Sequence, residues 1–204
     1  MCVYASVDLI SQDRKSEEVQ TLLKEKYQVE STIIRQGVDI ERFKETRKRD
    51  EKPRNILLSS SYYSQHSEIF KAIYDACAIK NITVHVIGKD FNWLWETEAV
   101  YNSSDMVFTL GRGCVEAMAC NKPVICLGHW GKNQMLSADG LITAENYKEI
   151  RKNNFSSRRF RKEWNTRDIL NEIEKYDSTT DYRKIVEKEH DIKNIVDKYL
   201  SLIK

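Results

Sequence analysis

Residues 105–127 constrain the fold of this chain more than any other part of its sequence. They read DMVFTLGRGCVEAMACNKPVICL, with one apolar run before the glycine turn at 111–113 and a second run at the end. The pattern predicts a strand, a tight turn, a short helix that begins near Cys114, and another strand. Glycines let the backbone approach a ligand closely, and the unpaired amides at a helix start favour an anion. The segment therefore predicts a ligand-binding crevice at one edge of a sheet.

Two charged residues accompany this turn. We expect Glu116 in the first helical turn, where the helix dipole favours a carboxylate and where sugar hydroxyls can donate hydrogen bonds to it. Arg112 stands between Gly111 and Gly113, and its forked donors suit a diphosphate. The alternatives are a carboxylate that only complements the helix dipole and an arginine that is simply exposed.

Apolar runs alternate with helical segments from Asn55 onward, which is typical of a parallel sheet. Strands are expected at 55–59 and 82–87, and helices at 65–79, 91–101, 144–152, 167–176 and 182–203, the last with a break. The predicted fold class is α/β: a Rossmann-like parallel sheet with helices on both faces, followed by a helical C-terminal tail.

The chain before Asn55 has a different character. A strand is expected at 2–10, a charged amphipathic helix at 14–26 and a strand at 31–35. Residues 41–54 are dense in charge and lack periodic apolar residues, so they are interpreted as a linker. The predicted organisation is residues 1–40 as the end of an upstream domain, a linker at 41–54, and the main domain at 55–204.

Composition excludes several classes of protein. The 204 residues are 41% hydrophobic and 31% charged, which fits a globular domain, and the net charge of +2 gives no global case for nucleic acid. No apolar run approaches the roughly 20 residues of a membrane span, and no secretory leader is recognised, so a cytoplasmic location is predicted. Five cysteines, three of them at 114, 120 and 126, indicate buried thiols, and no metal site is expected.

Further site candidates follow the other predicted strands, because open parallel sheets bind ligands beyond their carboxyl edge. Hydroxyls and amides at Ser59 and Ser60 suit a phosphate, with a plain helix cap as the alternative. Gly88 and Lys89 follow the second strand, where the lysine is equally well explained as a solvated charge. A loop containing Gly128 and His129 is expected after the strand that ends the 105–127 segment.

Two segments resemble the donor-binding half of the GT-B glycosyltransferases. Residues 116–125, Glu-Ala-Met-Ala-Cys-Asn-Lys-Pro-Val-Ile, are similar to the Glu-Ala-Met-Ala and Gly-x-Pro-Val-Ile signature of that family. Residues 35–43 resemble the Asn-Gly-Val-Asp-x-x-x-Phe segment that opens the interdomain linker of these enzymes. Asn121 stands where the family usually has glycine, and asparagine tolerates the left-handed conformation after a helix.

The resemblance implies a glycosyltransferase that moves a sugar from a nucleotide-sugar to an acceptor hydroxyl, in polysaccharide or glycoconjugate synthesis. Glu116 would hold the ribose, while Arg112 and the amides of Gly113 and Cys114 would stabilise the departing diphosphate. The nucleotide-sugar is substrate, and no cofactor is implied. The acceptor, a sugar or lipid-linked glycan, and the general base would come from a missing or separate domain, so this chain alone should bind and turn over weakly.

The chain also departs from the family. Retaining members carry a further glutamate eight residues before the position of Glu116, where this chain has Phe108, and an Arg and a Lys after the first strand, where it has Ser-Tyr-Tyr-Ser-Gln-His-Ser. The glycine turn is closer to inverting lipid-linked sugar transferases and to sugar-nucleotide epimerases, and the stereochemical outcome stays open. An epimerase-like enzyme and a non-catalytic sugar-nucleotide-binding or interaction domain are the alternatives.

Residues 153–162 form a basic segment with two phenylalanines. Its cations are Arg158, Arg159, Arg161 and Lys162. They suit peripheral contact with the inner face of a membrane, an acidic partner or a phosphate, and the alternative is a solvated turn between helices. No dedicated nucleic-acid module is predicted.

Overall fold

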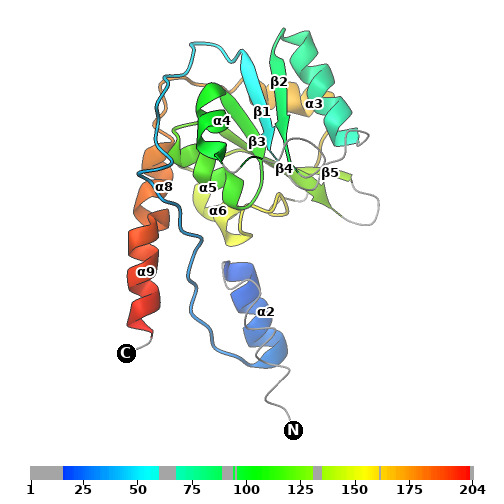
Figure 1. Ribbon diagram of the computed structural model, residues 1–204. Coiled ribbons are helices and arrows are strands. Elements are labelled where there is room, and N and C mark those ends of the chain that lie inside the picture. The colour runs from blue at the N-terminus through cyan, green and yellow to red at the C-terminus, as the bar shows by residue number, and fades with distance from the viewer. Residues whose placement is uncertain are drawn as a thin grey trace.

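A six-stranded sheet in the order β2-β1-β3-β4-β5-β6 forms the centre of the computed structural model (Figure 1). The structure describes residues 16–59, 68–88, 94, 96–130, 135–160 and 162–202. The strands are β1 (Asn55–Ser59), β2 (Thr83–Ile87), β3 (Met106–Thr109), β4 (Val124–Trp130), β5 (Met135–Leu141) and β6 (Lys162–Glu163). The described helices are α2 (Glu17–Tyr27), α3 (Glu68–Ile79), α4 (Thr97–Ser103), α5 (Arg112–Ala119), α6 (Tyr147–Lys152), α7 (Thr166–Ile173), α8 (Arg183–His190) and α9 (Ile192–Ser201).

Successive side chains of the apolar strands point to opposite faces of the sheet, and both faces are buried. Leu57 points into one core with α4, α5, α6 and α8, whereas Ile56 and Leu58 point into the other with α3 and α7. In β3, Val107 belongs to the first core and Phe108 to the second. Burial on both faces is the reason these strands are continuous apolar runs. The predicted α/β, Rossmann-like fold class with helices on both faces is confirmed.

The order of the strands reverses between β1 and β3. The chain passes from β1 through α3 on one face to β2, and returns through α4 on the opposite face to β3, which pairs with the other side of β1. The two crossovers therefore leave the sheet on opposite faces at this point. In open α/β sheets, a crevice forms beyond the carboxyl ends of the strands at such a switch point.

The predicted parallel sheet is confirmed from β1 to β4 but does not extend beyond them. Strands β1 to β4 are parallel, but β5 returns antiparallel to β4, and the two-residue β6 pairs antiparallel with β5. The sequence of β5, Met-Leu-Ser-Ala-Asp-Gly-Leu, has too few apolar residues to signal a strand. It becomes one because it pairs along the length of β4. The predicted loop at Gly128 and His129 is consequently the last part of β4.

The segment before β1 is only partly as predicted. Helix α2 lies close to the expected range, and its N-cap Ser16 accepts a hydrogen bond from the Val19 amide at 3.5 Å. The strand expected at 31–35 does not form, and among the described residues no strand pairs with that segment. The strand expected at 2–10 lies outside the described residues. The domain boundaries at 40 and 54 remain a prediction, although residues 41–54 contain neither helix nor strand, as a linker should.

The linker is fastened to the C-terminal helices, alongside which it runs in Figure 1. Val38 forms a bridge with Asp191, which is also the break between α8 and α9 that the sequence predicted. The guanidinium of Arg183 donates hydrogen bonds to the carbonyls of Ile40, Phe43 and Ala119 at 2.8–2.9 Å. One side chain of α8 therefore holds both the linker and the end of α5.

Asn121 occupies the left-handed position that the family resemblance assigns to glycine, with φ +58°. Its side chain also bonds at both ends: Nδ2 donates to Glu45 Oε2 at 3.0 Å, and Oδ1 accepts from the Tyr182 amide at 2.9 Å. Asparagine is one of the few non-glycine residues that tolerate this conformation. In this chain it therefore joins the turn after α5 to the linker and to α8, which glycine would not do.

Lys122 is fully buried, and burial lowers its pKa to about 8, while its Nζ donates to the Arg47 carbonyl at 3.0 Å. Because the folded pKa lies below the unfolded value, the charged amine costs stability at neutral pH, and this cost decreases as pH rises above about 8. We expect the stability of Lys122→Met relative to wild type to fall by about 1–2 kcal/mol from about pH 7.5 to about pH 9.5. Urea unfolding of both proteins measures this, and a relative stability that is constant with pH would contradict it.

Candidate functional site

Several predicted site residues meet where the strand order reverses. Ser59 ends β1, and its carbonyl accepts a hydrogen bond from Thr109 Oγ1 of β3 at 2.7 Å. Gly111 follows with φ +58° and ψ −128°, and α5 begins at Arg112 rather than near Cys114. Glu116 is therefore the fifth residue of the helix, not part of its first turn. The N-terminus of α5 lies at the carboxyl edge of the sheet because the helix follows β3 directly.

The two glycines of the turn serve different purposes. A Cβ on Gly111 would meet no atom within 4 Å, so this glycine is needed for its positive φ alone. A Cβ on Gly113 would lie 2.4 Å from Thr109 Oγ1, the hydroxyl that joins β3 to β1. Gly113 therefore lets the first turn of α5 pack directly on the end of β3. The backbone amides of this turn are thereby brought close to the carboxyl edge.

The carboxylate of Glu116 is held between two side chains. Arg112 Nε donates to Oε1 at 2.7 Å, and the Tyr101 hydroxyl donates to Oε2 at 3.3 Å. Only 12% of the Glu116 side chain is exposed, whereas 64% of Arg112 is exposed. Burial raises the pKa of the Glu116 carboxyl, and the charge and hydrogen bond of Arg112, with the hydrogen bond from Tyr101, oppose this rise. The result is an oriented hydrogen-bond acceptor whose arginine partner is largely exposed.

Tyr101 and Arg42 belong to this site although the sequence did not single them out. The Tyr101 side chain is 2% exposed, and the pKa of its hydroxyl is raised by burial and by the nearby Glu116 charge, while a hydrogen bond from Ser59 lowers it. Ser59, Tyr101, Glu116 and Arg112 thus form one polar chain. Arg42 of the linker binds Glu98 at 2.8 Å and also acts electrostatically on Glu116. Neither residue has a sequence signal, since each reaches the site only through the fold.

Cys114 packs into the core from the first turn of α5. Its thiol is fully buried and donates to the Thr109 carbonyl at 3.6 Å. The described cysteines, Cys77, Cys114, Cys120 and Cys126, are all free and buried, as predicted. Burial raises the pKa of Cys77 and of Cys120 to about 12, so these thiols stay protonated at neutral pH. Cys2 lies outside the described residues.

The remaining site candidates are distributed differently. Gly88 directly follows β2, at the same carboxyl edge as Ser59. Gly128 lies inside β4, where a Cβ would be 2.3 Å from Ser157 Oγ, so it is required for close packing and not for a loop. His129 is also in β4, and its side chain is not described. Ser60 and Lys89 lie outside the described residues.

Both arginine side chains that are described in the basic segment form ion pairs with carboxylates. Arg158 pairs with Glu18 of α2 at 3.1 Å, and Arg159 pairs with Glu149 of α6 at 2.5 Å. Arg161 lies outside the described residues, as does the side chain of Lys162. The two paired arginines join this segment to α2 and α6, and membrane contact through the four cations remains a prediction.

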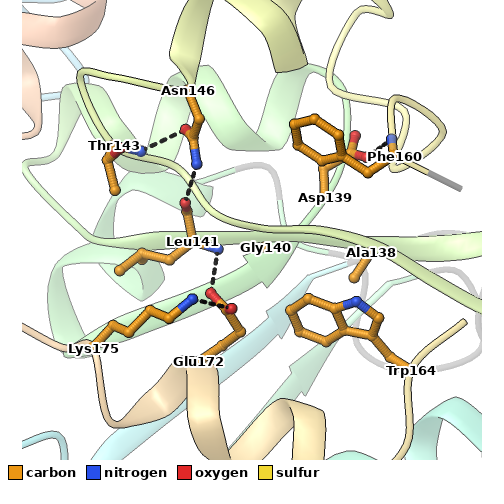
Figure 2. A pocket seen from close by; sticks show the side chains of 10 residues that line it. All are labelled: Ala138, Asp139, Gly140, Leu141, Thr143, Asn146, Phe160, Trp164, Glu172 and Lys175. Carbon is orange, nitrogen blue, oxygen red and sulfur yellow. Dashed lines mark hydrogen bonds and ion pairs between the residues drawn. The ribbon is translucent and has the colours of Figure 1, made fainter. Parts of the chain in front are cut away.

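A separate hollow of about 260 Å³ lies beside β5 and α7 (Figure 2). Glu172 borders it and accepts a hydrogen bond from the Leu141 amide at 2.9 Å, so this carboxylate caps the edge of β5. Phe160 and Trp164 form the opposite end, where the Trp164 indole nitrogen is buried without a partner. The residues that line the hollow include none of the predicted site residues, and Glu172 and Lys175 neutralise each other.

Two features are absent from the described residues. In this part of the chain, no helix has the length and apolar character needed to cross a bilayer, and no cluster of three or more His, Cys, Asp or Glu residues is placed to hold a metal ion. Comparison with known proteins adds no identity: no protein-family model matches the chain, and no curated protein is significantly similar to it.

Proposed function

We propose that the chain is the nucleotide-sugar-binding part of a glycosyltransferase, with its donor site at the carboxyl ends of β1 and β3. The observation that carries the proposal is the convergence of Ser59, the Gly111 turn and Glu116 where the strand order reverses. These residues are separate in the sequence, and the rule for open α/β sheets expects a ligand at this point. The two segments that resemble GT-B donor domains lend independent support.

Each group of the site has a role in this proposal. The Glu116 carboxylate, oriented by Tyr101, accepts hydrogen bonds from the ribose hydroxyls of the donor. The amides of Arg112 and Gly113 have no partner within α5 because they are in its first turn, and they receive the diphosphate. The exposed Arg112 guanidinium releases Glu116 and pairs with the phosphate charge. The acceptor hydroxyl and the base that activates it are supplied by a partner domain or chain.

A nucleotide titration tests the proposal directly. Calorimetry with UDP, GDP, ADP and CMP should show one nucleotide that binds with a dissociation constant of about 10–100 µM, near −6 kcal/mol, and the others more than tenfold weaker. The preferred base would identify the donor. A folded chain that binds none of them at millimolar concentration would overturn the proposed donor site.

The same titration separates the alternatives. A transferase donor half should bind the nucleoside diphosphate and the intact nucleotide-sugar and leave the sugar linkage unchanged. An epimerase-like enzyme would exchange or invert substituents of the sugar, which NMR of the recovered nucleotide-sugar detects. A non-catalytic domain would bind without any turnover after the acceptor-binding partner is added.

A further inference from the structure

Residues 153–157, which we call the strap, hold an unusual backbone conformation. Six non-glycine residues in the described part of the chain have positive φ, and three of them are in the strap: Asn154 at 53°, Phe155 at 52° and Ser157 at 59°. Asparagine tolerates this region, but for a bulky residue such as phenylalanine it is a true outlier. Such strain persists only where the surroundings fix the conformation, and it concentrates at functional positions.

One side of the strap is fastened to Gln36, in the segment that leads into the linker. Gln36 Nε2 donates to Asn154 Oδ1 at 2.7 Å, and the Gln36 carbonyl lies 2.7 Å from His190 Nδ1. The His190 ring in turn contacts Phe155, with ring centroids 6.1 Å apart, and its Nε2 lies 2.8 Å from the Tyr147 hydroxyl. Burial lowers the pKa of His190 to about 4, so the ring is neutral in this network. Gln36 therefore holds the strap directly through its side chain and indirectly through its carbonyl.

The other side of the strap is fastened to the glycine turn. The Phe155 carbonyl accepts the hydrogen bond of the Gly111 amide at 2.8 Å. The Ser157 carbonyl accepts a hydrogen bond from Ser137 Oγ of β5 at 2.6 Å, and its side chain packs against Gly128 of β4. Phe155 is 1% exposed and belongs to the buried core, which anchors the strap beside the turn. The strap thus connects Gln36 with Gly111, the residue just before α5.

We propose that the strap is a positioning element for the nucleotide site, and that through Gln36 it makes the geometry of the Gly111 turn depend on the residues that lead into the linker. This inference rests on the proposed function, since it assigns the turn to a ligand. Fixing the Gly111 amide sets the direction of the next two amides, which are the anion-binding groups. A displacement of Gln36 would release Asn154, loosen the Phe155 carbonyl and weaken donor binding.

Gln36→Met is the test, because it keeps the side-chain length and removes the donor to Asn154. Labelling with ¹⁵N-glycine gives one amide signal for each of the 7 glycines, so hydrogen exchange at Gly111 is measured directly. We expect exchange at Gly111 to be about tenfold faster and nucleotide affinity to fall about fivefold, with an unchanged midpoint of urea unfolding. Asn154→Asp retains an acceptor for Gln36 and should behave as wild type.

Gln20→Met is the matched control. Gln20 also donates a side-chain hydrogen bond to the segment before β1, to the Ser31 carbonyl at 2.5 Å, but it does not contact the strap in any bond described. Unchanged exchange at Gly111 in Gln36→Met, or equal acceleration in Gln20→Met, would overturn the inference. Faster exchange at Gly111 in a protein that binds no nucleotide would support the coupling and would overturn the proposed function instead.

Discussion

Replacement of Glu116 by glutamine is expected to weaken binding of the preferred nucleotide about 10- to 100-fold. A carboxylate accepts hydrogen bonds from both ribose hydroxyls, whereas the glutamine amide offers one neutral oxygen and a donor that meets the donating hydroxyls unfavourably. Hydrogen bonds to charged groups contribute about 1.5–3 kcal/mol, which corresponds to this range of affinity. Calorimetry of both proteins with the same nucleotide measures the change.

The same substitution should leave the fold intact. Burial raises the pKa of Glu116, so the ionised carboxylate is less stable in the folded protein than in the unfolded chain. The wild type therefore loses stability as pH rises from the unfolded value through the raised folded value, and the glutamine variant does not. Above that window, urea unfolding should place Glu116→Gln within about 1 kcal/mol of wild type.

Two controls make the binding result specific to the ribose. The 2′-deoxynucleotide should bind the wild type more weakly, and its affinity should change less on Glu116→Gln, because one of the two hydroxyls is already absent. Glu149→Gln removes a carboxylate on α6 that pairs with Lys152 and Arg159, and it should leave affinity unchanged. An equal loss for both nucleotides would contradict ribose recognition by Glu116.

Arg183→Met is expected to lower the free energy of unfolding by about 3 kcal/mol. The substitution removes charged hydrogen bonds to three carbonyls: that of Ile40 just before the linker, that of Phe43 in the linker, and that of Ala119, the last residue of α5. Each such bond contributes about 1.5–3 kcal/mol, and partial exposure of Arg183 lets water replace part of this. Thermal unfolding should shift down by about 6–12 °C for a chain of this size.

Arg183→Lys tests whether the positive charge alone is sufficient, and Arg167→Met is the control for the loss of an exposed arginine. Lysine keeps the charge but presents one ammonium group, which cannot span three carbonyls, so we expect it to recover less than half of the loss. Arg167 is an exposed arginine on α7, and its replacement should change stability by less than about 0.5 kcal/mol. A loss for Arg183→Met as small as that for Arg167→Met would show that the linker is not held by this guanidinium.

The local sequence was sufficient to predict an element wherever the residues that define the element lie within one segment. The strand predicted at 55–59 was confirmed to the residue, and the strand, turn, helix and strand of 105–127 all form. The left-handed position of Asn121 and the break in the C-terminal helix were likewise predicted. Apolar runs, glycines and helix caps act over a few residues, so their effect does not depend on the rest of the chain.

Local sequence was insufficient for β5 and for the segment at 31–35. Each contains a mixture of apolar and polar residues, and only pairing decides whether it becomes a strand. Strand β5 lies beside β4 and pairs along its length, while no strand in the described part of the chain pairs with residues 31–35. Strand formation depends on a partner because the backbone hydrogen bonds of a strand lie between segments rather than within one.

By itself, the sequence determined the α/β class and the glycine turn, whereas the pairing of Arg112 with Glu116 became evident only when α5 was found to begin at Arg112. Only the tertiary structure brought Tyr101 to Glu116, Thr109 to Ser59 and the Phe155 carbonyl to the Gly111 amide. These contacts join residues 15 to 50 positions apart. Their formation requires the crossovers to close first, so no local pattern encodes them, and the geometry of the candidate site follows from the order of the strands.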